Sequence, residues 1–547
     1  MINLDGIVKK QERVWEETRT FQVMDKDDFF YGTLDFTYND FLVELIIQGL
    51  PLYANPKSRY YLDNDILNRM DLCVDFLLRV QLESGLISLW NCNIDSPPDT
   101  AFSINYLGIC YFYIEKTNIK ELEPLKQKIR IFLQKTISAM ETGGFHTANH
   151  RWVISSALGM LYKIFGGEAL KNRVFEFLAE GFDINASGEW SERSNVIYNA
   201  VSDLYVYHIG EIFGVSEAFM VIKRNLDMMK YLFHPDYYIA TEYSTRQDRG
   251  TRARMDFRYT IVYLLMAVMY DEPEFVFLAE KALEYAPNFG MVLIYTALYE
   301  EKMLPEIEPK EISDSYTVLL NEKGIAEVPK KFSLFSDPIL RYRSNKLSIT
   351  IMAGQPEFMF LQYGSARAFG IKLPIGWFGM GGVCFPKIEC IDNKNYRMIT
   401  KVTGKYWQAL PEETVARYVG DFVKMPNNLR EDINKVETEI EVKIRLYDDG
   451  MELNISTPGL PMLFTQLVIM LDKSGSVTNA VKLDEHVLKL ERGKAVYESE
   501  GDRIEITGES SGHKLPLIRG DILNEKAQNL VLNATSPKNW KISFKCT

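Results

Sequence analysis

The sequence predicts an α+β protein of two domains, an N-terminal (α/α) toroid of helical hairpins followed by a C-terminal antiparallel β-sandwich. Apolar residues recur at helical spacing from about residue 38 to residue 303, and at period two after about residue 315. A chain of 547 residues is also too long for one ordinary core. We therefore expect a helical catalytic domain over 1–305 and a β domain over 306–547, joined by a Pro- and Glu-bearing linker near 304–311.

The helical half shows its pattern most clearly in NHRWVISSALGMLYKIFGG (149–167). Val153, Ala157, Met160 and Ile164 share one face, and the two glycines that follow predict the end of the helix. The stretch NVIYNAVSDLYVYHIGEIFG (195–214) repeats this form. Similar segments lie at 65–82, 101–116, 121–140, 169–181, 216–233, 256–270, 274–285 and 290–302. About ten or eleven helices in antiparallel pairs predict a ring of helical hairpins.

The C-terminal half alternates apolar and polar residues between Gly, Asp and Asn turns. LYDDGMEL is a strong hairpin signal. The expected strands are KLSITIMAG, EFMFLQYG, NYRMITKVTG, TEIEVKIRLYDDGMELNIST, LFTQLVIMLD, RIEITG and NWKISFKCT. Many short strands of this kind predict a large antiparallel sandwich.

Composition excludes some classes of function. A formal net charge of −12 without a basic stripe argues against nucleic acid as a partner. Six scattered cysteines without a CxxC pair indicate neither a zinc knuckle nor a disulfide framework. The N-terminus has no signal-peptide pattern, and the apolar run 259–270 is too short to span a bilayer. We expect a cytoplasmic protein that is not bound to a membrane, or a secreted or periplasmic one if a leader has been removed. The sequence leaves open whether the protein forms a homodimer.

The stretch GGFHTANHRW (143–152) is the first candidate for a site. Asn149, His150 and Arg151 fall in the first turn of the predicted helix, where unpaired N–H groups and the helix dipole favour an anion. An amide and an imidazole there could bind a carboxylate and acidify the neighbouring C–H. Two alternatives stay open: Thr147 caps the helix and the side chains bond locally, or His146 and His150 bind a metal ion, for which no third ligand is evident.

A second segment, GEWSERSNVIYN (188–199), brings further candidates. Glu189, Glu192 and Arg193 precede a helix that begins with Tyr198 and carries Tyr205 one heptad later. A tyrosine in a cationic pocket can transfer protons. A solvated charged surface and simple packing are the alternative interpretations.

Two loops complete the set of candidates. SLWNCNIDSPPDTAF (88–102) places Trp90, Asp95 and Asp99 on a Pro-Pro loop, and STRQDRGTRAR (244–254) gathers arginines, with Arg246 and Asp248 among its charged residues. A basic cluster in an acidic protein suits an anionic ligand, although a surface ion-pair network is the other interpretation.

Taken together, TANHRW, GEWSERSNVIYN and STRQD resemble the heparinase II/III-like polysaccharide lyase superfamily. The resemblance implies the same order of toroid and sandwich, and β-elimination from a uronate-containing glycan. By resemblance, Asn149 and His150 would neutralise the uronate carboxylate and Tyr198 would be the catalytic base or acid. Glu192 and Arg193 would support them or line subsites.

The chain departs from the family pattern at one place. Family members add a histidine from a sandwich loop, whereas the comparable stretch FLQYGSARAFGIKLPIGWFGMGG (360–382) has none, and His486 and His513 lie in unlike contexts. The metal ligands of some members have no counterpart either. No cofactor is expected, although a structural metal ion stays open.

The sequence thus favours a polysaccharide or oligosaccharide lyase with an acidic glycan as its substrate. The substrate-binding candidates are Trp90, Asp95, Asp99, His146, Arg151, Glu189, Glu192, Arg193, Tyr205, Arg246 and Asp248. Two alternatives remain: a glycoside hydrolase that uses a pair among Asp95, Asp99, Glu189, Glu192 and Asp248, and a non-catalytic glycan-binding protein.

Overall fold

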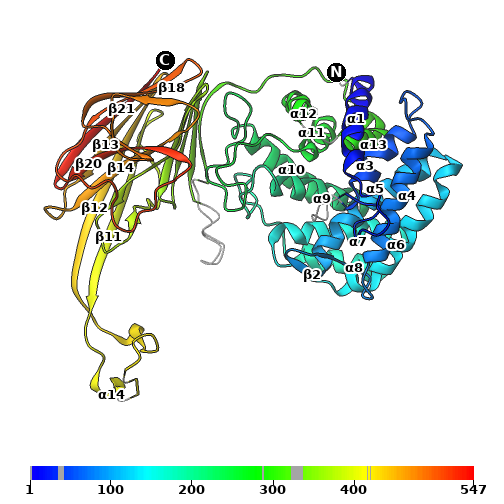
Figure 1. The fold of residues 1–547 in the computed structure, drawn as a ribbon, viewed down its shortest axis with the longest axis horizontal. Helices are drawn as coiled ribbons and strands as arrows, with labels where there is room; N and C mark the ends of the chain where they lie inside the picture. Colours follow the sequence, from blue (N-terminus) through cyan, green and yellow to red (C-terminus); the bar gives the residue numbers. More distant parts are fainter. Residues whose placement is uncertain (1–2, 35–41, 286–288, 322–336, 416, 419) are drawn as a thin grey trace. The chain divides into compact units, whose positions relative to one another are not determined.

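The computed structural model describes residues 3–34, 42–285, 289–321 and 337–547, apart from positions 416 and 419. Residues 35–41, where the helical pattern is expected to begin, lie outside this range. The chain divides into two compact units: residues 1–233 with 237–313, and residues 234–236 with 314–547. The first unit is mainly helical and the second is mainly β (Figure 1). The predicted α+β class is therefore confirmed.

The helices of the first unit are joined partly by short connections and partly by longer segments, of which 180–197 and 230–256 precede α9 and α11. They are α1 (Leu4–Thr18), α3 (Glu44–Tyr53), α4 (Asn64–Val80), α5 (Pro97–Thr117), α6 (Glu123–Thr142), α7 (Ala148–Phe165), α8 (Glu168–Ala179), α9 (Tyr198–Phe213), α10 (Ser216–Met229), α11 (Phe257–Tyr270), α12 (Pro273–Tyr285) and α13 (Phe289–Tyr299). The unit also contains a small hairpin of β1 (Ile87–Leu89) and β2 (Asn93–Ser96). Most consecutive helices pack on each other, and α13 packs against α1, α3 and α5.

Helices α7 and α9 lie in the interior of this unit. Helix α7 packs against α5, α8 and α9, and α9 also contacts α10 and α11. Both are therefore buried on several sides, which is more than the single apolar face that the spacing predicts. The predicted ends are confirmed: Gly166 follows α7 with φ of 73°, and Gly214 follows α9 with φ of 69° in the left-handed region.

The second unit consists of two sheets. Its strands are β3 (Ser315–Leu320), β4 (Ile339–Ser344), β5 (Leu347–Met352), β6 (Glu357–Tyr363), β7 (Ala366–Lys372), β8 (Pro374–Ile375), β9 (Gly381–Gly382), β10 (Glu389–Cys390), β11 (Asn395–Trp407), β12 (Asp432–Tyr447), β13 (Gly450–Thr457), β14 (Phe464–Asp472), β15 (Ser476–Thr478), β16 (Val481–Asp484), β17 (Val487–Lys489), β18 (Arg492–Ser499), β19 (Asp502–Glu509), β20 (Ala527–Thr535) and β21 (Lys538–Cys546). The strand order is β10-β11-β12-β13-β21-β19-β18-β15 in one sheet and β16-β17-β20-β14-β7-β6-β5-β4-β3 in the other. Apolar residues of both sheets form one core.

The long pair β11–β12 extends beyond the neighbouring strands and ends in the segment with the short helix α14 (Glu412–Val415) (Figure 1). The predicted hairpin is confirmed, because Tyr447 and Gly450 are paired where β12 turns into β13. Residues Gly364 and Ser365 form the turn between β6 and β7. There the N–H and the hydroxyl of Ser365 donate to the carboxylate of Asp502, which ties this turn to the start of β19.

The segment 234–236 groups with the β unit although it lies between helices in the sequence. The His234 Nδ1 atom is 3.0 Å from the hydroxyl of Ser348 on β5, and its ring packs against Phe360 on β6, with the ring centroids 4.6 Å apart. The sequence assigns only His486 and His513 to this half. The structure adds His234 as a third histidine of the β unit, although in the sequence it lies between two helices.

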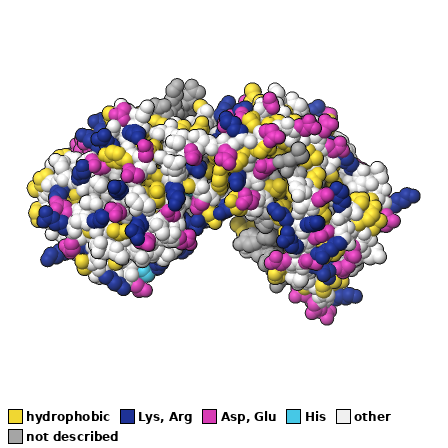
Figure 2. Space-filling view, turned by 90° about the horizontal axis from the view of Figure 1, so that it is seen from above, with side chains coloured by type: hydrophobic (Ala, Val, Ile, Leu, Met, Phe, Trp, Pro, Cys, Tyr) yellow, Lys and Arg dark blue, Asp and Glu magenta, His cyan; other side chains and the backbone are white. Residues whose placement is uncertain are grey.

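Further expectations concern the whole chain. All six cysteines are free thiols. None of the described helices is both long and apolar enough to cross a membrane. On the face shown in Figure 2, basic and acidic side chains are interspersed rather than gathered into a broad patch of one sign.

Candidate active site

The side chain of Asn149 is held at the start of α7 by the carboxylate of Glu192. The first turn of a helix has backbone N–H groups without helical partners. Glu192 Oε1 accepts a bond from the Asn149 N–H at 3.2 Å, and Oε1 and Oε2 accept bonds from Asn149 Nδ2 at 2.9 and 2.7 Å. Thr147 is the residue before the helix, but its hydroxyl accepts a bond from the Asn149 side-chain amide and none from a backbone N–H of the first turn, so it does not cap the helix through its side chain.

Glu192 is a buried carboxyl group in a mixed electrostatic environment. Only 7% of the residue is exposed. Burial raises the pKa of the Glu192 carboxyl, and the nearby charge of Asp183 raises it further. The bonds from Asn149 and the charge of Arg246 lower it, but the net shift of the pKa is upward. Asn149 is 1% exposed, and its Oδ1 accepts no hydrogen bond from any described residue. The NH₂ group of the amide therefore donates to Glu192 and Thr147, and its oxygen accepts no bond from a described residue.

His150 is the next residue on α7 and is half-buried. Its ring packs edge-on against Phe102 and His146, with centroid distances of 6.3 and 4.8 Å. Burial lowers the pKa of His150 to about 4, helped by His146 and Arg246 and opposed by Asp99. Its Nδ1 has no partner among the described residues. At neutral pH, His150 is therefore an uncharged imidazole that can donate or accept one bond, not a cation.

Tyr198 begins α9, and its phenol is half-exposed. The side-chain amide of Gln247 donates a hydrogen bond to the phenol oxygen at 2.6 Å. The guanidinium carbon of Arg246 lies 5.1 Å from the centre of the Tyr198 ring. The two contacts place a hydrogen-bond donor at the phenol oxygen and a positive charge over the ring.

The segment 241–250 is fastened to the start of α9 by Asp248, which is 3% exposed. Asp248 accepts bonds from the hydroxyls of Ser194 and Ser244 at 3.0 and 2.5 Å and from the N–H of Val196 at 3.3 Å. Thr245 adds a bond to the backbone oxygen of Glu192 at 2.8 Å. Asp248 therefore organises the segment that carries Arg246 and is not itself available to a ligand.

Arg246 links these groups into one site. It contacts Tyr198, and its charge acts on both Glu192 and His150. Its Nε has no hydrogen-bond partner within the described part of the chain. The structure thus brings Asn149, His150, Glu192, Tyr198 and Arg246 together from α7, the segment before α9 and the 241–250 segment.

The Pro-Pro loop contributes one residue to the neighbourhood of this site. Asp99 acts electrostatically on His150, and its Oδ2 accepts bonds from Asn93 and Ser96 at 2.9 and 2.5 Å. Asp95 is exposed and bonds to Ser84. Trp90 packs in an aromatic cluster with Phe29, Phe30 and Phe76. The structure therefore places only Asp99 of these three beside the imidazole.

Arg151 and Tyr205 have structural partners. The Arg151 guanidinium forms ion pairs with Glu180 and Asp183 at 2.9 and 2.8 Å. Tyr205 is 1% exposed and packs against Phe102, with a centroid distance of 6.0 Å. Its ring is thus connected to His150 through Phe102.

Glu189 and Arg193 form a buried ion pair with an N–O distance of 3.3 Å. The Arg193 side chain also packs over the ring of Tyr243. Because both charged groups are almost fully buried, this pair maintains the loop before α9, and separating the two would leave a buried charge.

His146 is exposed beside His150, as the two-histidine alternative requires. Among the residues that the structure describes, no three His, Cys, Asp or Glu side chains are arranged to hold a metal ion. The geometry of this pair therefore offers no third protein ligand within that part of the chain.

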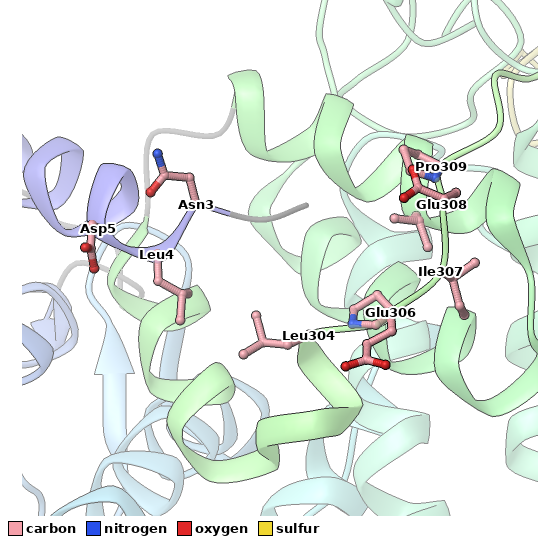
Figure 3. A pocket seen from close by; sticks show the side chains of 10 residues that line it. Asn3, Leu4, Asp5, Leu304, Glu306, Ile307, Glu308 and Pro309 are labelled. Atoms are coloured by element: carbon pink, nitrogen blue, oxygen red, sulfur yellow. The ribbon is translucent and has the colours of Figure 1, made fainter.

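Two cavities lie elsewhere in the helical unit. One of 520 Å³ is bounded by the start of α1 and the segment 304–309, with Asp5, Glu306 and Glu308 among its lining residues (Figure 3). Another of 300 Å³ lies where α7 and α9 end, between Lys163, Glu211 and the neighbouring apolar side chains. The candidate site lies at the opposite ends of these two helices, where they begin.

Sequence reasoning missed two residues of the site. Gln247 lies within the quoted STRQD motif, but only the position of Tyr198 gives it a role. Phe102 follows the Pro-Pro loop and separates His150 from Tyr205. Neither residue carries a local signal, because amides and aromatic rings are common in loops and cores.

No protein-family model and no curated protein matches the chain. Several solved structures do. A mutant of heparan sulfate lyase HepC from Pedobacter heparinus matches with a TM-score of 0.51 and 10% identity, covering 98% of this chain and 82% of that one. Chondroitin AC lyase from Streptomyces coelicolor A3 in complex with chondroitin sulphate matches with a TM-score of 0.51 and 10% identity. This match covers 99% of this chain and 79% of that one.

Xanthan lyase from Paenibacillus has a TM-score of 0.57 at 8% identity, with 100% of this chain and 58% of that chain covered. The three matches span both units of the chain. At identities this low, the likeness concerns the fold. The chain therefore has the fold of these polysaccharide lyases.

Proposed function

We propose that the protein is a glycan lyase that cleaves uronate-containing polysaccharides or oligosaccharides by β-elimination. The observation that carries this proposal is the convergence of Tyr198, Arg246 and the Asn149–His150 pair at the starts of α7 and α9. The shared fold supports the general class. We further propose a heparinase II/III-like enzyme, with the helical unit as an (α/α) toroid and the two sheets as a sandwich.

The reaction begins with the carboxylate of the uronate. A hydrogen bond from His150 and the positive charge of Arg246 withdraw electron density from it, which acidifies the C5–H bond, while Asn149 is held beside them by Glu192. Because His150 is neutral, Arg246 supplies the charge and the imidazole supplies one N–H bond. The enzyme thus stabilises the negative charge that develops when C5 loses its proton.

Tyr198 transfers the proton. Its phenolate takes the proton from C5, the C5–H electron pair forms the C4=C5 double bond, and the C4–O4 bond breaks. The departing O4 takes a proton from the phenol or from water. Gln247 and Arg246 stabilise the phenolate before this step. No bound cofactor is needed for these changes.

The carboxylates of the hydrolase alternative already have partners. Asp248 accepts three hydrogen bonds, and Glu189 is paired with Arg193. An acid and a base for hydrolysis need to face a substrate across a cleft. These contacts favour the lyase over the hydrolase.

Replacement of Tyr198 by Phe tests the proposal. The unsaturated product absorbs in the ultraviolet, so a panel of uronate-containing glycans is screened with the wild type and the responding substrate is used for the variant. We expect Y198F to lose about 10²–10⁴-fold in rate, the usual contribution of a positioned acid or base.

Tyr207→Phe on the same helix is the matched control, because its ring packs against Phe219 and Tyr299. It should retain wild-type activity. Turnover without a new double bond would contradict the lyase and favour a hydrolase. Equal activity of Y198F and the wild type would remove Tyr198 from the mechanism.

A further inference from the structure

The far part of the β11–β12 ribbon, with the segment that joins the two strands, forms an arm of the β unit (Figure 1). Strand β10 pairs with β11 only at Tyr396 and Arg397, and β13 pairs with β12 only from Glu441 onward. Beyond these positions, β11 and β12 pair with each other and with no other described strand. A two-stranded ribbon alone is only marginally stable in water, so the arm gains from any surface that covers it.

Large apolar side chains are exposed along this arm. We call six of them the arm patch, and their exposed fractions run from 50% to 89%: Phe378, Tyr406, Trp407, Phe422, Val423 and Leu429. Phe378 belongs to the loop between β8 and β9, and its ring centre lies 5.3 Å from that of Tyr406 at the end of β11. Neither ring is buried by this contact, so both remain available to a partner.

Contacts of Arg430 bring the apolar side chains of the tip back to the end of β11. Its Nη1 donates to the backbone oxygen of Gln408 at 3.1 Å, and its guanidinium carbon lies 5.6 Å from the ring centre of Phe422. The N–H of Gln408 also donates to the backbone oxygen of Glu431 at 2.8 Å. Phe422 and its neighbour Val423 therefore lie close to Trp407, and the patch is a local cluster.

The size of the arm patch is that of a protein interface. A large apolar side chain has about 150–250 Å² to bury, so six of them that are at least half exposed offer roughly 600 Å². A standard interface takes about 800 Å² from each partner, and Met380 and Val415, which are 43% and 45% exposed, add to the area. An exposed apolar cluster of this size is typical of an interaction site.

The charge of the arm favours a second copy of this chain as the partner. Residues 400–440 contain six basic and seven acidic side chains, whereas the whole chain has a net charge of −12. Several of these charges are paired within the arm, as in Lys401–Glu437 at 2.6 Å and Lys405–Asp432 at 2.7 Å. Two copies of an acidic protein can therefore meet at the arm without net repulsion, and an acidic glycan or an anionic lipid surface finds no excess of positive charge there.

The open edges of the ribbon do not suit the pairing of two copies strand to strand. Lys401 and Lys405 lie on β11, and Glu437 and Glu439 lie on β12. Antiparallel pairing of either strand with its own copy would bring like charges together, which is how natural sheet edges avoid association. The apolar side chains of the arm patch are under no such restriction, because an apolar surface is complementary to itself.

We infer that the protein forms a homodimer in which the arm patch of one copy packs against the arm patch of the other. A two-fold axis relates the two patches, so the contact closes and no further copies add to it. The dimer does not depend on the proposed function, because none of the candidate active-site residues belongs to the arm.

The first experiment measures the oligomeric state of the full chain by analytical ultracentrifugation over about 0.1–100 µM. We expect a reversible dimer of the wild type with a Kd of about 1–10 µM, as suits an interface at the lower end of the usual size. Phe422→Asp places a charge in the patch and should raise this Kd at least about 30-fold, the effect of losing a central aromatic residue.

Met220→Asp is the matched control, because Met220 on α10 is 54% exposed and lies outside the arm. It should dimerise like the wild type, and circular dichroism verifies the fold of each variant. A wild type that stays monomeric at about 100 µM overturns the inference, and so does a dimer that F422D leaves intact or that M220D weakens equally.

The second experiment tests that the two patches face each other. Phe422→Asp and Phe422→Lys should each be monomeric, because like charges then meet across the axis. An equal mixture of the two should form a dimer again, since opposite charges attract across the contact. If the mixture stays monomeric, the patch-to-patch arrangement is wrong.

The third experiment tests other occupants of the patch. The wild type and F422D are sedimented with vesicles of phosphatidylcholine and phosphatidylserine, and are titrated with hyaluronan. We expect F422D to bind each probe as the wild type does. A monomeric wild type that binds the vesicles or the polysaccharide, and loses this binding in F422D, overturns the inference and assigns the patch to a lipid surface or a glycan.

Discussion

The side-chain amide of Gln247 lies 2.6 Å from the phenol oxygen of Tyr198 and donates a hydrogen bond to it. Because the amide is the donor, the phenol's own proton must point elsewhere. When this proton leaves, the bond becomes a charge-assisted one and grows stronger. Gln247 therefore lies where it can affect the proposed proton transfer by Tyr198.

Replacement of Gln247 tests this relationship. Gln247→Ala removes the donor and should lower kcat about tenfold, whereas Gln247→Glu replaces the donor with an anion and should lower it about 100-fold, as expected for a bond to a charged group. In Q247E the rate should also rise only at a higher pH than in the wild type. A pH–rate profile measures both effects, and a wild-type profile for Q247E would contradict the assigned role.

Arg246 should act on three groups at once. Arg246→Met keeps much of the side-chain volume and removes the charge, so kcat/KM should fall about 100-fold through weaker stabilisation of the developing carboxylate charge. Since the arginine lowers the pKa of both His150 and Glu192, each pKa should rise in the variant.

Initial rates and histidine NMR titrations measure these changes. Arg249→Met, three residues further along the same segment, is the matched control for a general loss of positive charge. If both variants lose the same activity, the effect of Arg246 is not local to the site.

His208 should make stability depend on pH. It is buried between Ser156 and Tyr295, and burial lowers its pKa to about 3, from 6.5. The unfolded chain then protonates this group below about pH 6.5 while the folded protein does not. The contribution is therefore fully present above pH 6.5 and is lost as the pH falls, by about 1.4 kcal/mol per pH unit down to about pH 3.

Urea unfolding at a series of pH values measures this dependence. His208→Gln keeps hydrogen-bonding capacity without a titrating ring, so its unfolding free energy should fall less steeply between about pH 6 and 4.5. Parallel curves for the wild type and the variant would show that His208 is not the group responsible.

Local patterns predict most of the regular structure. The glycines after α7 and α9 end them as expected, and the alternation in 438–457 gives the β12–β13 hairpin. Helix α1 is missed because its buried face consists of only a few residues, such as Ile7, Val8 and Trp15, among many charged ones. Strand β4 is missed because it is buried on both sides and carries the buried Arg341.

The candidate site is predictable in its residues but not in its contacts. Asn149, His150 and Tyr198 follow from helix starts and from the family resemblance. The role of Glu192 depends on a contact between residues 43 positions apart, and that of Gln247 on one between residues 49 apart. Sequence periodicity does not reveal contacts between residues so far apart in the chain. The orientation of the Asn149 amide and the uncharged state of His150 therefore become visible only in the folded structure.

The anchoring of the 241–250 segment by Asp248 determines which positions near the site can be changed without moving it. The carboxylate ties Ser194 and Val196, just before the helix of Tyr198, to the turn that carries Arg246. The phenol and the guanidinium are thus held in place by one buried carboxylate. The exposed residues Arg249 and Gly250 lie beyond this fastening, so substitutions there should leave the positions of Tyr198 and Arg246 unchanged.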